Sequence, residues 1–202
     1  MQRAFMLSVS AVVMICAAAA AAQLPPPLPP PTLLSLTGTY GATGTTGCLT
    51  LVTPAQFNSV NSGFLASGTS SNSTALEELW TFNGDGTGTA KGSTMGINIP
   101  PPPELASASS SNTSFSFTYT VNADRSFTLD TVPGTSKGTV LTGGRAGQTF
   151  SVDNLPTLTG LISRNGNTLT LATLTPGVNT ITYSNNTGFN RVCHSSRVFT
   201  KL

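Results

Sequence analysis

Charged residues are scarce in this chain of 202 residues, since Asp, Glu, Lys and Arg together make up only 8% of it. The formal net charge is +2, so the chain lacks the basic field that holds a phosphate backbone, and we expect no nucleic-acid partner. The missing charge is replaced by Thr, Ser, Asn and Gly rather than by the charged tracts of disordered proteins. The length fits one folded domain with a core of its own.

Histidine is scarcer still, because His194 is the only one, and it follows Cys193 directly. A Ser-His-Asp triad would need this residue, but no Gly-X-Ser-X-Gly elbow is present. Neighbouring residues of a strand point to opposite faces, so His194 and Cys193 do not form a catalytic pair. Glu77 and Glu78 are expected to be solvated turn charges rather than paired acids across a cleft. We therefore expect a non-enzymatic protein with no catalytic residue, metal site or cofactor.

One segment superficially resembles a calcium loop. Residues 82–88 place oxygen-bearing side chains at alternate positions, but Thr94 stands where the closing Glu of such a loop belongs. A plain hairpin turn is the preferred interpretation.

A long apolar run occurs only at the N-terminus. Arg3, the apolar run 6–15 and the small residues 17–22 predict a signal peptide over residues 1–22, in a style that resembles bacterial signals. No later segment approaches the roughly 20 apolar residues of a membrane-spanning helix, so we expect no transmembrane segment after signal removal. The protein is predicted to be exported, to the periplasm or to the extracellular space and cell surface.

Cysteine is also rare. Cys16 leaves with the predicted signal, and Cys48 and Cys193 remain. Two cysteines in an oxidising compartment predict one disulfide, with two buried free thiols as the alternative. They lie near opposite ends of the folded region, so a bridge would close a long loop. By restricting the unfolded chain, such a bridge would stabilise the fold by about 4–5 kcal/mol.

Proline is concentrated after the signal. Residues 23–34 form a Pro-rich tether, which is expected to adopt polyproline II and to act as a spacer; a Pro-binding partner is the alternative. Residues 35–202 are then a single β-barrel domain. The second Pro cluster, at 100–103, and the polar stretch 67–74 are expected to be loops.

The rest of the chain alternates apolar and hydroxyl side chains with the period of a strand. The clearest examples are 115–121, 127–129, 150–152, 169–171 and 181–183. Only 74–79 offers a helical turn.

Turn-forming residues recur with a fixed spacing. One set starts at 122, 143, 164 and 185 and a second at 133, 154 and 175, each 21 residues apart. The two sets predict that the chain reverses every ten or eleven residues. The fold class is all-β, an antiparallel up-and-down meander. Closing it into a barrel of about eight to ten strands hides both edges, and a disulfide from first strand to last fits that closure. A β-sandwich is the alternative.

Gly38-Thr39-Tyr40 near the domain start and Arg197 near its end resemble the calycin, or lipocalin, superfamily. That family has Gly-X-Trp on its first strand and an Arg packed across the Trp. Here Tyr40 stands in place of the Trp, and the helix before the last strand is not evident. The resemblance implies a cup for a small apolar ligand.

Aromatic residues on the apolar sides of the expected strands are the candidates for lining such a cup, although a packed core uses the same residues. The five ligand-pocket candidates are Trp80, Phe117, Tyr119, Phe127 and Tyr183. The predicted function is that of an exported β-barrel that binds a small hydrophobic ligand. The alternative is a structural or interaction protein of the cell envelope or surface, and an outer-membrane barrel is disfavoured because the outward residues are Thr and Ser.

Overall fold

The computed structural model describes residues 36–51, 69–175 and 177–202, and all regular secondary structure in these ranges is β-strand. The predicted signal peptide (1–22) and tether (23–34) lie outside the described residues. These ranges contain no apolar helix of membrane-spanning length. The strands are β1 (Thr37–Leu51), β2 (Ser70–Asn83), β3 (Thr87–Ile99), β4 (Ser107–Val121), β5 (Ser126–Thr131), β6 (Lys137–Thr142), β7 (Thr149–Asp153), β8 (Leu158–Ile162), β9 (Thr168–Ala172), β10 (Val178–Tyr183) and β11 (Gly188–Lys201).

The all-β prediction is confirmed, and two local expectations are wrong. The helical turn over 74–79 is strand, and so is most of the stretch 67–74 expected to be a loop, because β2 begins at Ser70. Its side chains alternate between the two faces of the sheet, and burial of one face outweighs a short helical propensity. The Pro cluster at 100–103 does lie in the loop between β3 and β4.

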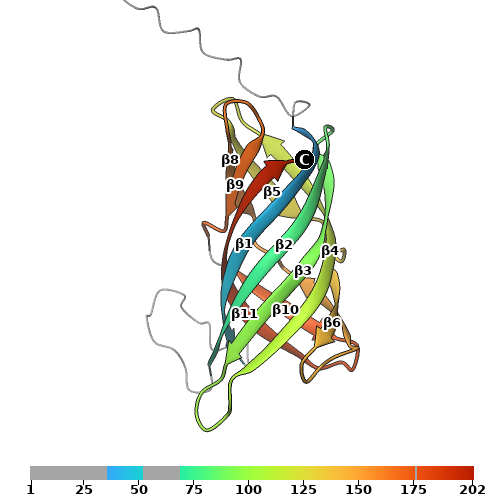
Figure 1. The fold of residues 1–202 in the computed structure, drawn as a ribbon, viewed down its shortest axis with the longest axis vertical. Helices are drawn as coiled ribbons and strands as arrows, with labels where there is room; N and C mark the ends of the chain where they lie inside the picture. Colours follow the sequence, from blue (N-terminus) through green and yellow to red (C-terminus); the bar gives the residue numbers. More distant parts are fainter. Residues whose placement is uncertain (1–35, 52–68, 176) are drawn as a thin grey trace, which may run out of the picture.

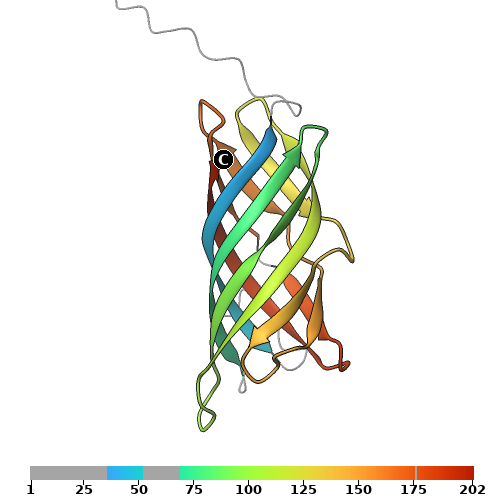
Figure 2. The same cartoon turned by 45° about the vertical axis from the view of Figure 1, so that its right-hand side comes forward.

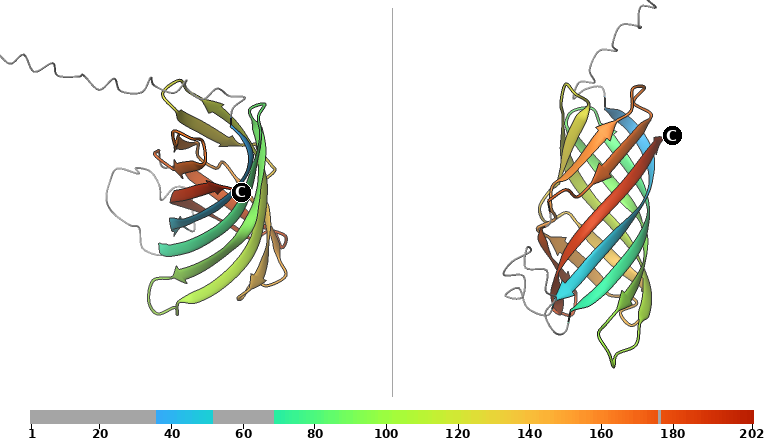
Figure 3. Two further views of the ribbon diagram at one scale, coloured as in Figure 1. Left: turned by 45° about the horizontal axis from the view of Figure 1, so that its top comes forward. Right: turned by 90° about the vertical axis from the view of Figure 1, so that its left-hand side faces the viewer.

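All eleven strands belong to one antiparallel sheet that closes on itself, because β1 pairs with both β2 and β11. The sheet forms a barrel-like cylinder in which β1 to β4 and β11 run its whole length (Figures 1 and 2), and β11 lies beside β1 where the sheet closes (Figure 3). At the upper end of Figure 1, β5, β8 and β9 complete a ring of eight strands; at the lower end, β6, β7 and β10 complete a second ring with the same five long strands.

The short strands are halves of three interrupted long ones. β5 pairs with the last residues of β4, and β6 continues in the same direction along its earlier residues. The same holds for β7 followed by β8, and for β9 followed by β10. The chain therefore reverses at the turns near 122, 143, 164 and 185, whereas the turn-like segments near 133, 154 and 175 only interrupt a strand. The expected reversal every ten or eleven residues is wrong, and the true spacing is 21.

Two hairpin turns at the upper end share one hydrogen-bonding pattern. Asp85 Oδ1 accepts hydrogen bonds from the backbone N–H (2.9 Å) and hydroxyl (2.6 Å) of Thr87, and Asp124 accepts the corresponding pair from Ser126. These bonds hold the pKa of both Asp side chains below its usual value. The segment that resembles a calcium loop is therefore a side-chain-capped turn, as preferred from the sequence.

The closure of the sheet coincides with the disulfide. Cys48 of β1 and Cys193 of β11 lie directly opposite each other in the antiparallel register, and their sulfur atoms are bonded. The disulfide therefore joins the first strand to the last, as the sequence predicts.

An aromatic core fills the upper half of the cylinder. Trp80 contacts Phe117 and Phe199 at centroid distances of 5.0 and 5.2 Å, and Phe82 contacts Phe117 and Tyr119 at 5.1 Å each. These rings are at most 4% exposed. Edge-to-face packing of this kind adds to the stabilisation that comes from burying the rings.

Glycine makes room for the large rings. Gly160 of β8 is paired with Phe127 of β5, and a Cβ at Gly160 would overlap the Phe127 ring and the carbonyl oxygen of Thr170. Gly138 of β6 stands in the same relation to Phe150 of β7 in the lower half. A strand glycine opposite an aromatic residue thus lets the ring lie flat against the backbone.

Candidate ligand site in the interior

The structure separates the five ligand-pocket candidates. Trp80, Phe117, Tyr119 and Phe127 are brought together in the upper core, at 0%, 1%, 4% and 0% exposure. Tyr183 belongs to β10, near the lower end, and is only half-buried. The upper candidates pack mainly against one another, whereas Tyr183 belongs to a different group of side chains.

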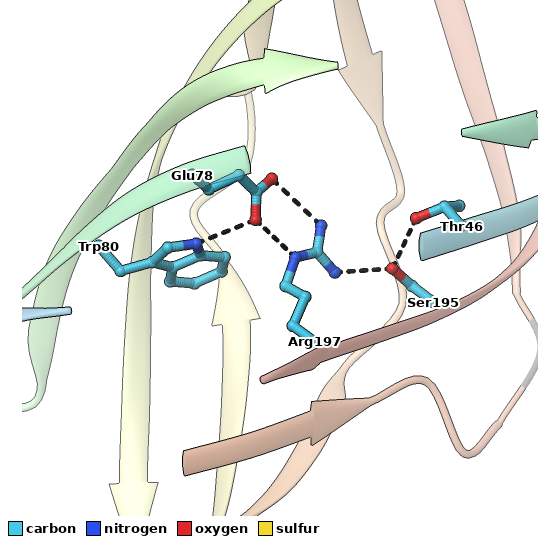
Figure 4. Close-up of polar contacts among 5 residues, drawn as sticks. All are labelled: Thr46, Glu78, Trp80, Ser195 and Arg197. Carbon is cyan, nitrogen blue, oxygen red and sulfur yellow. Dashed lines mark hydrogen bonds and ion pairs between the residues drawn. The ribbon is translucent and has the colours of Figure 1, made fainter. Parts of the chain in front are cut away.

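Glu78 and Arg197 form a buried ion pair beside Trp80 of the aromatic core (Figure 4). The Nε of Arg197 donates to Glu78 Oε2 at 2.6 Å, and the indole nitrogen of Trp80 donates to the same oxygen at 3.0 Å. Arg197 also donates from Nη1 to the Ser195 hydroxyl at 2.7 Å, which in turn bonds with the Thr46 hydroxyl at 2.7 Å. The network spans β1, β2 and β11 on both sides of the line where the sheet closes.

This network corrects one expectation. Glu78 is buried and belongs to strand β2, so its assignment as a solvated turn charge is wrong; Glu77, its neighbour, is exposed as expected. The guanidinium carbon of Arg197 lies 5.7 Å from the Trp80 ring centroid, while the cation over Tyr40 is Lys201, at 5.8 Å. The Glu78 carboxylate bonds to Trp80 and Arg197, so it ties β2 to β11.

The lower half of the interior has a different lining. On β1 to β4 its inward residues are small and polar, and each is partly exposed rather than sealed. These residues are Thr46, Thr50, Asn72, Thr74, Thr94, Asn98, Ser111 and Thr113. These side chains are smaller than the aromatic rings that line the upper half.

Aromatic and basic side chains meet on the opposite wall, and we call them the lower-end cluster: Arg145, Phe150, Tyr183, Phe189 and Arg191. Tyr183 lies between Phe150 and Phe189, at centroid distances of 5.9 and 6.1 Å. Arg145, from the β6–β7 turn, places its guanidinium carbon 4.2 Å from the Tyr183 centroid and 5.9 Å from that of Phe189. The rings are half-buried, so the cluster combines apolar surface with positive charge.

Arg191 is the most unusual member of the cluster. It shares the inward face of β11 with Cys193, two residues on, and its Nε donates to Asn179 Oδ1 at 2.7 Å. Burial lowers the pKa of its guanidinium to about 10, an effect that the nearby Tyr183 phenol partly opposes. Asn179, 1% exposed, is fixed in turn by a weak contact of its amide nitrogen with Cys193 Sγ at 3.8 Å.

Hollows are also present on the outer face. The larger, with a volume of about 670 Å³, lies over β4, β6, β7 and β10. Most of its lining is outward Ser, Thr, Asn and Lys side chains, but Phe150 and Tyr183 of the lower-end cluster also line it. A second covers β2 to β4 and includes Glu77 and Lys91. Both are open to solvent and carry no converging set of reactive groups.

His194 and Cys193 do not form a pair, and no metal-binding cluster appears in the described part of the chain. His194 is exposed while Cys193 is buried, so the two face opposite sides of β11 as expected. Within residues 36–51, 69–175 and 177–202 no three His, Cys, Asp or Glu side chains gather as metal ligands would.

Only Tyr183 of the lower-end cluster is among the five candidates from the sequence, so sequence reasoning missed the other four members. Arg191 could have been found, because a residue two positions before a buried Cys of a strand shares its face. Arg145 lies in a turn, where no periodicity assigns a direction to a side chain.

No protein-family model, curated protein or solved structure matches this chain.

Proposed function

We propose that this protein is an exported, non-enzymatic binding protein that holds one small molecule with an apolar body in the lower half of the closed sheet. The observation that carries the proposal is the asymmetry of the interior. Above the Glu78–Arg197 pair large rings pack against one another, and below it small hydroxyl side chains face a half-buried aromatic wall. A ring of eight strands is the size at which an interior either fills with side chains or accommodates a single small ligand.

Of the candidates, Tyr183 is the one we assign to ligand contact. Its ring is half-buried and borders both Phe150 and Phe189, so an apolar ligand there would cover surface that is now wet. Burying apolar surface contributes about 25 cal/mol per Å², which supports micromolar binding for a ligand of modest size. In this proposal the other four candidates do not contact the ligand but form the packed core that closes the site from above: Trp80, Phe117, Tyr119 and Phe127.

Export to an oxidising compartment is part of the same proposal. The disulfide between Cys48 and Cys193 is of the kind that persists in oxidising compartments, and the sequence of residues 1–22 has the features of a signal peptide. We place the protein in the periplasm or at the cell surface, with residues 23–34 as a tether.

The proposal is tested by native mass spectrometry of the protein released from its own cell envelope without detergent. We expect a population heavier than the mature chain by one small molecule, which is lost on unfolding. A protein that carries no added mass, and that gains none when offered apolar compounds, would contradict the proposal.

A second function is favoured by the outer face of β3. Met95, Ile97 and Ile99 point outward near the lower end and are 61%, 52% and 55% exposed. Exposed aliphatic residues in a row are typical of contact surfaces, so a structural or interaction role in the envelope is the alternative. Replacing all three by Thr would leave ligand binding intact but abolish envelope retention if this role is correct.

A further inference from the structure

The interior of the closed sheet carries an unbalanced positive charge. All seven acidic residues of the chain lie in the described part, and only Glu78 is buried. Its carboxylate is the partner of Arg197, in the one ion pair formed among residues 36–51, 69–175 and 177–202. The other six are exposed, so Arg191 faces the lower interior without a counter-ion.

The free end of Arg191 is available for binding. Its Nε bond to Asn179 fixes the orientation of the side chain, while neither terminal nitrogen has a hydrogen-bond partner among the described residues. These nitrogens also remain in contact with solvent. Among the described residues, the one fully buried side-chain nitrogen or oxygen without a partner is Gln148 Oε1, so the unpartnered nitrogens of Arg191 are not fully buried. With Nε bonded to Asn179, the two terminal nitrogens of the guanidinium remain as donors. Their spacing matches the two oxygens of a carboxylate.

Gln148 supplies a second unsatisfied group in the same half. Its backbone carbonyl accepts a hydrogen bond from the backbone N–H of Val140 in β6, and its side-chain Oε1 is fully buried without a partner among the described residues. The amide oxygen and nitrogen are assigned by their surroundings, so this position offers a bound molecule either an acceptor or a donor. Buried polar groups are normally satisfied, and a polar ligand that bonds to Gln148 Oε1 would account for this exception.

We infer that the ligand of the lower interior is a small organic anion, an aromatic carboxylate, whose charged end is held by Arg191 and whose ring packs against Tyr183, Phe150 and Phe189. Arg145 adds a second positive charge at the mouth, over the Tyr183 ring. This inference rests on the proposed function and specifies the chemistry of the ligand.

The anion should bind more tightly than a neutral molecule of the same shape. A charge-assisted hydrogen-bonded pair contributes about 1.5–3 kcal/mol, which corresponds to about tenfold to a hundredfold in affinity. Burial lowers the pKa of the Arg191 guanidinium, and no acidic side chain of the described residues lies beside it to offset this effect. Binding of the anion should therefore raise that pKa.

The test is calorimetric titration of the mature protein at pH 7 with 2-naphthoate and with the neutral isostere 2-naphthamide. We expect 2-naphthoate to bind at least tenfold more tightly. Arg191→Gln should bring its affinity down to that of the amide. The control is Arg164→Gln, which removes the same charge from an exposed turn at the upper end and should leave the preference unchanged.

The outcomes separate the two proposals. Equal binding of acid and amide overturns the anionic ligand and leaves the proposed function standing. Absence of binding for both compounds overturns the proposed function and the inference with it. If Arg164→Gln reduces the preference as much as Arg191→Gln, the effect is general electrostatics and the assignment to Arg191 is wrong. Should Arg191→Gln lose its near-ultraviolet circular dichroism, Arg191→Lys replaces it; this variant keeps the charge without the fork and should lose at least half of the preference on a logarithmic scale.

Discussion

Neutralising Glu78 is the perturbation that tests the interior network most sharply. In the Glu78→Gln variant the shape of the side chain is kept, but Arg197 loses its counter-ion inside the sheet. The side chains of Arg197 and Glu78 are 11% and 4% exposed, so solvent replaces little of the lost interaction. The new amide group would also meet the indole N–H of Trp80, which now donates to Glu78 at 3.0 Å.

The expected loss is about 3–5 kcal/mol in the free energy of unfolding, the cost of leaving one partner of a buried ion pair uncompensated. Equilibrium urea unfolding measures it, and the fluorescence of Trp80, the only tryptophan, reports the transition. Glu77→Gln is the matched control, since the neighbouring side chain is exposed and its change should stay within about 0.5 kcal/mol.

The double variant Glu78→Leu/Arg197→Leu completes the experiment. Removing both charges leaves no buried ion without a partner, so this variant should be more stable than Glu78→Gln. If Glu78→Gln and Glu77→Gln destabilise the protein equally, Glu78 does not hold a buried ion pair and the reasoning fails.

Three further predictions concern the closure, the packing and the pH dependence of the sheet. Replacing Cys48 and Cys193 together by Ser should lower the free energy of unfolding by up to about 4–5 kcal/mol, and thiol titration of the unfolded, unreduced protein should find no free thiol; two free thiols would contradict the bridge. Gly160→Ala should destabilise by about 1–3 kcal/mol in chemical unfolding because its methyl group would overlap a ring and a backbone oxygen, whereas Gly47→Ala, with open space around it, should not; equal effects would refute the close approach. Burial raises the pKa of Tyr40, so its contribution to stability is present below about pH 10 and is lost as pH rises through the raised pKa; Tyr40→Phe should flatten this alkaline slope, and an unchanged slope would count against it.

Much of the fold could be predicted because its determinants are local. Period-two alternation located the strands around Phe117, Phe127 and Tyr183, and the two remaining cysteines located the closure. The direction of the chain could not be predicted in the same way. Residues near 133 and 154 have the composition of hairpin turns, but the strand after each continues forward, because pairing with neighbouring strands decides direction.

The site was predicted less well, because polar residues inside a sheet resemble those outside it. Glu77 and Glu78 are chemically identical neighbours, and only the register of β2 against β1 decides which is buried. The aromatic candidates could be identified as inward, but alternation does not tell which end of the sheet a residue occupies. Alternation alone therefore groups Tyr183 with the upper rings, although it lies with Arg145 near the other end.

The location of the ligand is the central claim, and intermolecular nuclear Overhauser effects from bound 2-naphthoate test it most directly. With tyrosine and tryptophan rings selectively labelled, we predict contacts from the naphthalene protons to Tyr183, together with a shift of the Arg191 guanidinium resonances, and no contact to Trp80. Contacts to Trp80, or a bound naphthoate that touches neither Tyr183 nor Arg191, would contradict a ligand site in the lower half of the interior.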